Sequence, residues 1–392
     1  MNNFTYYTPT KVVFGKDTER EAGKLVRDFG GTKVLVHYGT GSVVRSGLLD
    51  RVCASLKEEG LEFIKLGGAV PNPRISLVYE GIELCRKENV DFVLAVGGGS
   101  AIDSAKAIAY GAVYDGDVWN LYLKKETPKA ALPLGVVITL AATGSEMSNS
   151  SVITNEDGWK KRGLNNDLSR PRFAIMNPEL TYTLPEYQTM CGCVDIIMHT
   201  LERFFSHEKD TELTDYLAES VIKSVMHSAK ILKKNPCDYN ARAEVFWAGS
   251  LSHNGLTGCG RKGDWACHQL EHELSGMFDV AHGAGLSAVW GSWARYVLKD
   301  DVDRFVKLAV DVLNVPMDYD DPEKTALEGI EAMEDFFRSI NMPVSISELG
   351  VELNDDIIKE LSWKCTYMGT RKIGGLKILD QNDMEEIYRM AK

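Results

Sequence analysis

The segment at residues 91–109, DFVLAVGGGSAIDSAKAIA, constrains the fold of this chain more than any other. An apolar run at residues 92–96 leads through three glycines and a serine into a stretch with helical periodicity. A buried strand that turns sharply into a helix is the repeating unit of parallel α/β sheets. Three glycines let the backbone approach a ligand, and the free N–H groups of the helix would face an anion. The segment predicts a phosphate-binding turn, although a tight turn without a ligand would share the pattern.

The rest of the first half repeats this alternation of strand and helix. Further β-rich runs occupy residues 33–38, 61–66, 135–140 and 172–176, with helical stretches such as 77–88 and 101–110 between them. This alternation predicts a parallel sheet with helices on both faces. From about residue 185 helical periodicity takes over, at residues 211–232, 239–253, 302–312 and 324–340. We therefore expect an α/β domain at residues 1–184 and an all-helical domain at residues 185–392, with a boundary near residue 150 as the alternative.

Composition and charge exclude several classes of protein. The 392 residues include 44 Lys and Arg against 56 Asp and Glu, a net charge of −12, which argues against nucleic-acid binding. The N-terminus lacks the basic start and apolar core of a secretory signal. The longest nearly apolar run, residues 130–144, is shorter than the ~20 residues that a membrane helix needs. Eight scattered cysteines without a CxxC pair fit reduced thiols, so we expect a cytoplasmic protein without membrane contact.

Two more loops rich in small and hydroxyl residues follow strands. The first is Gly39-Thr40-Gly41-Ser42, although Val44 breaks a GxGxxG fingerprint, and the second is the loop that follows the strand at 135–140. Open α/β sheets bind ligands at the carboxyl ends of their strands, so three such loops predict a nucleotide site. In the glycine turn, Ser100 is the expected helix cap and Asp103 the acid of a capping-box variant.

The end of the strand at 33–38 bears on cofactor choice. A carboxylate at that edge would bind a ribose 2′-hydroxyl and repel a 2′-phosphate. Here Gly39 is followed by hydroxyls and backbone amides, which can accept a phosphate. The pattern favours NADP(H) and leaves NAD(H) open.

Histidine is concentrated in the second half. Residues 268–282 contain three of the eight histidines, and Asp195 and His199 upstream are spaced to share one helix face. One carboxylate oxygen and three imidazole nitrogens suit Fe(II), Zn(II) or another first-row divalent ion. His272, one turn after His268, has three open roles: metal ligand, proton relay or core residue.

Together these motifs resemble those of the iron-containing (group III) alcohol dehydrogenase family, and in particular its butanol dehydrogenase and aldehyde reductase branch. The resemblance spans nearly the whole chain. It includes the opening at residues 4–15, Pro71-Asn72-Pro73, the GGGS turn, the loop at 142–146, the segment at 192–202, His268-x-x-x-His272 and His282-Gly283. It implies an N-terminal dinucleotide-binding domain, an all-helical C-terminal domain, a divalent metal with Fe(II) ahead of Zn(II), and a homodimer.

The resemblance also implies site residues. The metal ligands would be Asp195, His199, His268 and His282. The candidate cofactor contacts are Gly39, Gly41, Ser42, Asn72, Gly97, Gly98, Gly99, Ser100, Asp103, Thr139, Leu140, Thr143, Ser145 and Lys161. The match at Lys161 is looser because Lys160 is adjacent. Leu140 and Ala142 depart from the family's usual TTxGTGSE loop, where a threonine and a glycine stand, and Gly39 replaces an aspartate of many relatives.

The reaction implied is the oxidation of a primary alcohol such as butanol, or the reduction of its aldehyde, by hydride transfer to or from NAD(P). The metal would act as a Lewis acid. His272 is the candidate for proton transfer, and a residue that only supports the ligands is its alternative. Three other readings remain: a polyol dehydrogenase, a lyase similar to dehydroquinate synthase, and a non-catalytic metal- or nucleotide-binding module.

Overall fold

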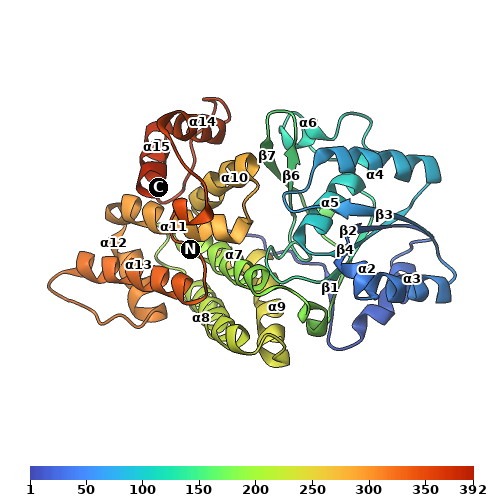
Figure 1. Cartoon of the computed structure of the whole chain (residues 1–392), viewed down its shortest axis with the longest axis horizontal. Helices are drawn as coiled ribbons and strands as arrows, with labels where there is room; N and C mark the ends of the chain where they lie inside the picture. Colours follow the sequence, from blue (N-terminus) through green and yellow to red (C-terminus); the bar gives the residue numbers. More distant parts are fainter. The chain divides into compact units, whose positions relative to one another are not determined.

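The computed structural model describes all 392 residues and divides into two compact units (Figure 1). One unit is Tyr7–Leu184, and the other combines Pro185–Lys392 with Met1–Tyr6. The first six residues thus group with the helical unit, where the backbone N–H of Asn2 donates to the carbonyl of Gly260 at 2.8 Å. The sequence pattern had placed these six residues in the α/β domain.

The unit Tyr7–Leu184 is built on a six-stranded sheet in which every pairing is parallel. Its strands are β1 (Lys11–Phe14), β2 (Lys33–Gly39), β3 (Glu62–Ala69), β4 (Phe92–Gly97), β5 (Leu134–Ile138) and β8 (Phe173–Met176), in the order β1-β8-β5-β4-β2-β3. The helices are α1 (Ala22–Asp28), α2 (Ser42–Arg45), α3 (Leu48–Glu58), α4 (Ile75–Glu88), α5 (Gly99–Val113) and α6 (Trp119–Tyr122). The predicted parallel α/β architecture is confirmed.

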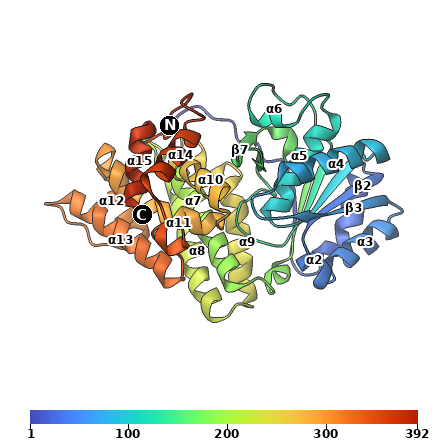
Figure 2. The ribbon, with the colours of Figure 1, turned by 45° about the horizontal axis from the view of Figure 1, so that its top comes forward.

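Burial on both faces explains why the central strands are continuous apolar runs. Every residue of β4, β5 and β8 is buried, and α2 and α3 lie on one side of the sheet while α4 and α5 lie on the other (Figure 2). Parallel strands covered in this way need no polar alternation. Phe92 and Phe173 stack at 6.1 Å within the core.

The strand order creates a switch point beside β2. The chain passes from β2 to β3 on one side and returns to β4 on the other side, so β2 pairs with both. Ligands of open α/β sheets bind outside the carboxyl ends of the strands at such a point. A separate antiparallel hairpin, β6 (Ser150–Asn155) and β7 (Lys160–Asn165), follows β5 and was not predicted.

The unit that contains Pro185–Lys392 is all-helical, as predicted. Its helices are α7 (Glu186–Phe204), α8 (Glu212–Lys234), α9 (Tyr239–His253), α10 (Ala266–Phe278), α11 (His282–Val297), α12 (Val302–Lys307), α13 (Pro322–Ser339), α14 (Asp355–Cys365) and α15 (Gln381–Met390). A π-helical turn, Leu308–Val312, follows α12 within the stretch expected to be one helix. No helix combines the length and the apolar content that a membrane span would require.

The helix α7 forms the centre of this unit. Its residues from Thr189 to Glu202 are all buried. It packs tightly on the start of α11, because a β-carbon built on Gly283 would lie 2.1 Å from the carbonyl oxygen of Cys191. Only glycine fits there, so Gly283 holds the beginning of α11 against α7.

Candidate functional site

One face of α7 presents three polar side chains to the interior of the helical unit. Asp195, His199 and Glu202 stand four and three residues apart, which places them on one side of a helix. All three are at least 95% buried. Buried charged and polar groups require partners or a bound ion, so this face is a candidate metal centre.

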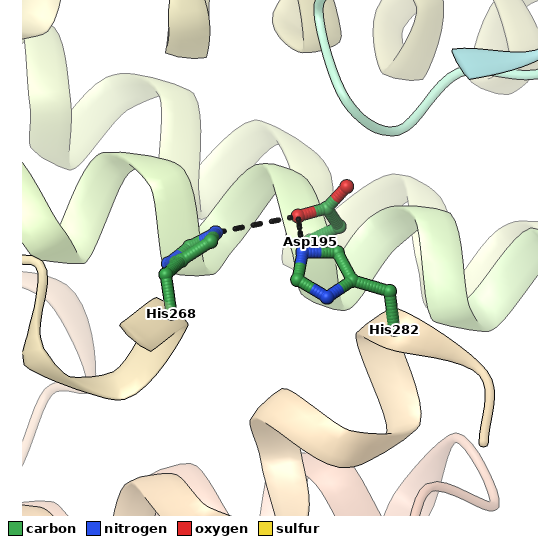
Figure 3. A group of neighbouring side chains, drawn as sticks. All are labelled: Asp195, His268 and His282. Carbon is green, nitrogen blue, oxygen red and sulfur yellow. Dashed lines mark ion pairs between the residues drawn. The ribbon is translucent and has the colours of Figure 1, made fainter. Parts of the chain in front are cut away.

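Two histidines from neighbouring helices point at Asp195 (Figure 3). Nε2 of His268, in α10, lies 3.6 Å from Oδ1 of Asp195, and Nε2 of His282, the first residue of α11, lies at the same distance. Nδ1 of His199 lies 3.3 Å from the same oxygen. We call Asp195 and these three histidines the cluster. The ligand atoms of Asp195, His268 and His282 all lie within 4.8 Å of one another, and His199 is not part of that closer group.

The spacing and the unused lone pairs fit a bound divalent ion. Tetrahedral coordination with bonds of about 2.1 Å separates ligand atoms by about 3.4 Å, close to the distances measured from Asp195. Three buried atoms in the cluster have no hydrogen-bond partner: Oδ1 of Asp195, Nδ1 of His199 and Nε2 of His268. Buried polar atoms are rarely left unpaired, so three in one place indicate a site for a cation.

Two buried glutamates hold the histidine rings from outside. One oxygen of Glu202 accepts both from Nδ1 of His268 and from its backbone N–H, each at 2.8 Å. Glu271 of α10 accepts a hydrogen bond from Nδ1 of His282. In both rings Nε2 is therefore the nitrogen turned toward Asp195.

Glu202 and Glu271 were not proposed as site residues. Glu202 lies in the segment at residues 192–202, and its position seven residues after Asp195 was a usable signal. Glu271 has no local signal, because its partner is at the start of another helix.

The carboxylates of Asp195 and Glu202 favour a positive charge beside them in this cluster. Burial disfavours a charged ring at His268, but the carboxylates of Glu202 and Asp195 outweigh it and raise the pKa of His268 to about 9. Burial, followed by electrostatic repulsion from His253 and His268, lowers the pKa of His199 well below its ordinary value. A neutral His199 is the form that binds metal.

His272 lies beside the cluster and outside the group around Asp195. Its ring centroid is 6.4 Å from that of His268 and 5.6 Å from that of His282. With Glu271 and His282 it forms a second group whose ligand atoms lie within 4.8 Å of one another. The half-buried ring is therefore adjacent to His282 and partly open to solvent.

In the α/β unit, the predicted cofactor loops follow three adjacent strands. Gly39 ends β2, Gly97 ends β4, and Thr139 follows β5, where its N–H donates to the carbonyl of Gly97 at 3.0 Å. These loops meet at the carboxyl edge of the sheet beside the switch point. The structure thus brings together the three segments that the sequence singled out.

The glycine turn packs directly on the segment at residues 139–149, here called the β5 loop. A β-carbon on Gly99 would lie 2.6 Å from Oγ1 of Thr143, and one on Gly98 would lie 3.2 Å from the β-carbon of Leu140. A side chain at Gly99 would collide with Thr143 whether or not a ligand is bound, whereas one at Gly98 would need Leu140 to shift by a few tenths of an ångström.

The capping prediction for this turn was wrong. The helix α5 begins at Gly99 with Gly98 as its N-cap and without a side-chain cap. The carboxylate of Asp103 instead accepts from Ser145 Oγ at 2.6 Å and from the backbone N–H of Val152 at 2.9 Å. Asp103 is therefore tied to the β5 loop.

Two further candidate cofactor contacts, Asn72 and Lys161, lie together in the structure. Asn72 lies in the turn between β3 and α4 with a positive φ of 53°. Its Oδ1 accepts from Nζ of Lys161 in β7 at 3.0 Å, and both side chains are buried. The hairpin, missed from the sequence, is the element that brings Lys161 to Asn72.

Comparison with known proteins identifies the family. Residues 9–178 match the iron-containing alcohol dehydrogenase model, and residues 189–391 match the C-terminal model of the Fe-containing alcohol dehydrogenase family. The chain is 39% identical to NADH-dependent butanol dehydrogenase A of Clostridium acetobutylicum and 34% identical to NADPH-dependent aldehyde reductase YqhD of Escherichia coli, with 100% of each chain covered. The crystal structure of NADH-dependent butanol dehydrogenase A from Thermotoga maritima matches with a TM-score of 0.96 at 37% identity, covering 100% of this chain and 99% of that one. This chain is an NAD(P)-dependent oxidoreductase and belongs to the iron-containing alcohol dehydrogenase family.

Proposed function

We propose that this protein interconverts primary aliphatic alcohols and aldehydes, such as butanol and butanal, with NADP(H) as the favoured cofactor. The reaction is RCH2OH + NADP+ ⇌ RCHO + NADPH + H+. The observation that carries the proposal is the cluster of Asp195, His199, His268 and His282, in which the first three are buried and each has one side-chain atom without a hydrogen-bond partner. The similarity to butanol dehydrogenases and to an aldehyde reductase supports the substrate class.

Each part of the helical site has a separate task in this proposal. Asp195 and the three histidines would hold a divalent ion, Fe(II) or Zn(II), which would supply Lewis-acid chemistry at the substrate oxygen. Oδ1 of Asp195 supplies the negative charge of the ligand set. The burial of Asp195, His199 and His268 strengthens their electrostatic interactions, while the side chain of His282 is partly exposed.

His272 is proposed to move the proton. Alcohol oxidation releases one proton, which must reach solvent from the buried site. His272 is half-buried, its ring centroid is 5.6 Å from that of His282, and an imidazole suits proton exchange near neutral pH. For His272→Ala we expect a lower kcat and an altered dependence of kcat on pH. An unchanged rate and profile would remove His272 from the reaction.

The preference for NADP(H) rests on the end of β2. No carboxylate stands at Gly39-Thr40-Gly41, and a β-carbon built on Gly41 would lie 2.6 Å from Nη1 of Arg45. A cation beside a strand end without an acid suits a 2′-phosphate. Relatives named as NADH-dependent and as NADPH-dependent are both similar to this chain. The proposed preference for NADP(H) therefore rests on the residues that follow β2 and not on these relatives.

The deciding experiment is an aldehyde-reduction assay with butanal. Enzyme as purified is compared with chelated enzyme that has been resupplied with Fe(II) or Zn(II), with NADPH and NADH side by side. We expect metal to restore turnover and NADPH to be consumed faster than NADH. Faster turnover with NADH would refute the cofactor choice alone. Absence of turnover with any aliphatic aldehyde would refute the substrate class and direct the assay to polyols and then to the lyase reaction.

A further inference from the structure

A lysine inside the α/β unit is completely buried and binds only the protein backbone and one hydroxyl. Lys106, in α5, has no exposed surface. Its Nζ donates to the carbonyl oxygens of Ser145, Ser148 and Ser150 at 2.7, 2.9 and 2.7 Å, with Ser148 Oγ at 3.4 Å. An ammonium has three N–H groups, so the three carbonyls match its capacity.

The three carbonyls belong to one connected stretch. Ser145 and Ser148 lie in the β5 loop, and Ser150 begins β6. The same stretch is tied by Arg170, whose Nη1 donates to the carbonyl of Met147 at 2.7 Å. Asp103, one turn before Lys106 on α5, accepts from Ser145 Oγ on the same loop. Side chains from outside the loop thus add to its internal hydrogen bonds, such as those from the N–H groups of Met147 and Ser148 to the carbonyl of Gly144.

The shape of the β5 loop determines where Thr143 lies. Gly99 has no room for a β-carbon because Thr143 fills the space, so the glycine turn and the β5 loop are in direct contact. The helix α5 begins in that turn and carries Lys106 two turns later. One helix thus fixes both loops that follow β4 and β5.

We propose that Lys106 is a positioning residue for nucleotide binding, which holds the β5 loop in the shape that presents its hydroxyls and amides beside the glycine turn. The inference rests on the proposed function in taking this edge of the sheet as the nucleotide site. It does not require Lys106 to touch the cofactor.

The charges around Lys106 come from three elements. Asp103 faces it from α5, Glu146 from the β5 loop and Arg170 from the segment before β8. Burial is the main effect and lowers the pKa of Lys106 to about 8, against the attraction of Asp103 and Glu146. A neutral amine has one N–H fewer and no charge, so it would hold the three carbonyls less firmly.

The test compares Lys106→Met with Lys106→Arg and with a matched control, Lys33→Met. Lys33 is the first residue of β2 and lies at the amino ends of the strands, opposite the loops at their carboxyl ends. Its Nζ pairs with Glu88 at 3.3 Å. NADPH and NADH are titrated into the holoenzyme by fluorescence, and metal content is measured in parallel. We expect Lys106→Met to weaken nucleotide binding at least about tenfold, because buried carbonyls lose their partners. Lys33→Met should bind as wild type does, and all variants should keep their metal.

The pH dependence supplies a readout that a purely structural role would not change. We expect the nucleotide affinity of the wild type to fall as the pH rises through about 8, following the pKa of Lys106, and Lys106→Arg to remove this fall because its guanidinium stays charged. If Lys106→Met fails to fold, the wild-type and Lys106→Arg profiles decide. Equal affinity in Lys106→Met and wild type, or identical pH profiles in wild type and Lys106→Arg, would overturn the inference. A wild type that binds no nucleotide would instead overturn the proposed function.

Discussion

Glu202 offers the sharpest test of how the metal centre is held together. Its one oxygen satisfies two buried donors of His268, the ring Nδ1–H and the backbone N–H. Glu202→Leu leaves both without an acceptor. Each unsatisfied buried donor costs about 1–3 kcal/mol, so the free energy of unfolding of the metal-free protein should fall by about 2–6 kcal/mol. The ring of His268 would also lose its fixed orientation, which typically lowers metal affinity about 10–100-fold.

Glu202→Gln separates the hydrogen bonds from the charge. A glutamine oxygen can still accept from both donors, while bonds to a neutral acceptor are about half as strong. We therefore expect a smaller loss, about 1–2 kcal/mol of stability and about tenfold in metal affinity. A suitable control is Glu219→Gln, which changes a buried glutamate of α8 that pairs with Lys307 at 3.0 Å outside the cluster.

Two measurements decide the outcome. Stability is followed by circular dichroism during urea unfolding of the chelated protein, and metal affinity by competition between Co(II)-loaded protein and a chelator. The reasoning would be refuted if Glu202→Leu bound metal as tightly as wild type, or if the leucine and glutamine variants were equally stable.

Three further predictions concern other parts of the molecule. His268→Ala should reduce the metal content to a small fraction of wild type, measured by elemental analysis, while the circular dichroism of the α/β fold persists; full metal stoichiometry would contradict the ligand assignment. Gly99→Ala should lower the free energy of unfolding by about 1–3 kcal/mol and weaken nucleotide binding, because the new methyl group collides with Thr143. Unchanged stability in urea unfolding would contradict the close packing of Gly99 on Thr143. Burial lowers the pKa of His37 from 6.5 to about 4, so between these pH values the unfolded chain binds more protons than the folded one. The free energy of unfolding should therefore fall by about 3 kcal/mol as the pH drops from 6.5 to 4. In urea-unfolding measurements at several pH values His37→Gln should flatten this fall, and an unchanged slope would contradict the lowered pKa of His37.

The sequence was most informative where local pattern and tertiary structure agree. The central strands β4, β5 and β8 are buried on both faces and appear as apolar runs, so they could be predicted to within two residues at each end. The hairpin could not, because β6 (SSVITN) and β7 (KKRGLN) are short and rich in polar residues. Their pairing is stabilised by contacts distant in sequence, such as Lys161 with Asn72.

The same division applies to the sites. The positions of Asp195 and His199 follow from helical spacing, and the density of histidine marked His268 and His282. Glu271 and Lys106 gave no such signal, because a glutamate or lysine on a helix is ordinarily exposed and paired with water. Their roles depend on atoms 11 to 44 residues away, which only the packed structure brings into contact.

The arrangement of Asp195, His199 and Glu202 along α7 also limits how this chain can change in length. Successive residues of an α-helix are about 100° apart around its axis. A single insertion between Asp195 and Glu202 would rotate one part of the trio away from His268 and His282, whatever residue was inserted. Insertions and deletions should therefore be tolerated around Tyr319, which is 87% exposed in the loop before α13, and rejected within these two turns of α7.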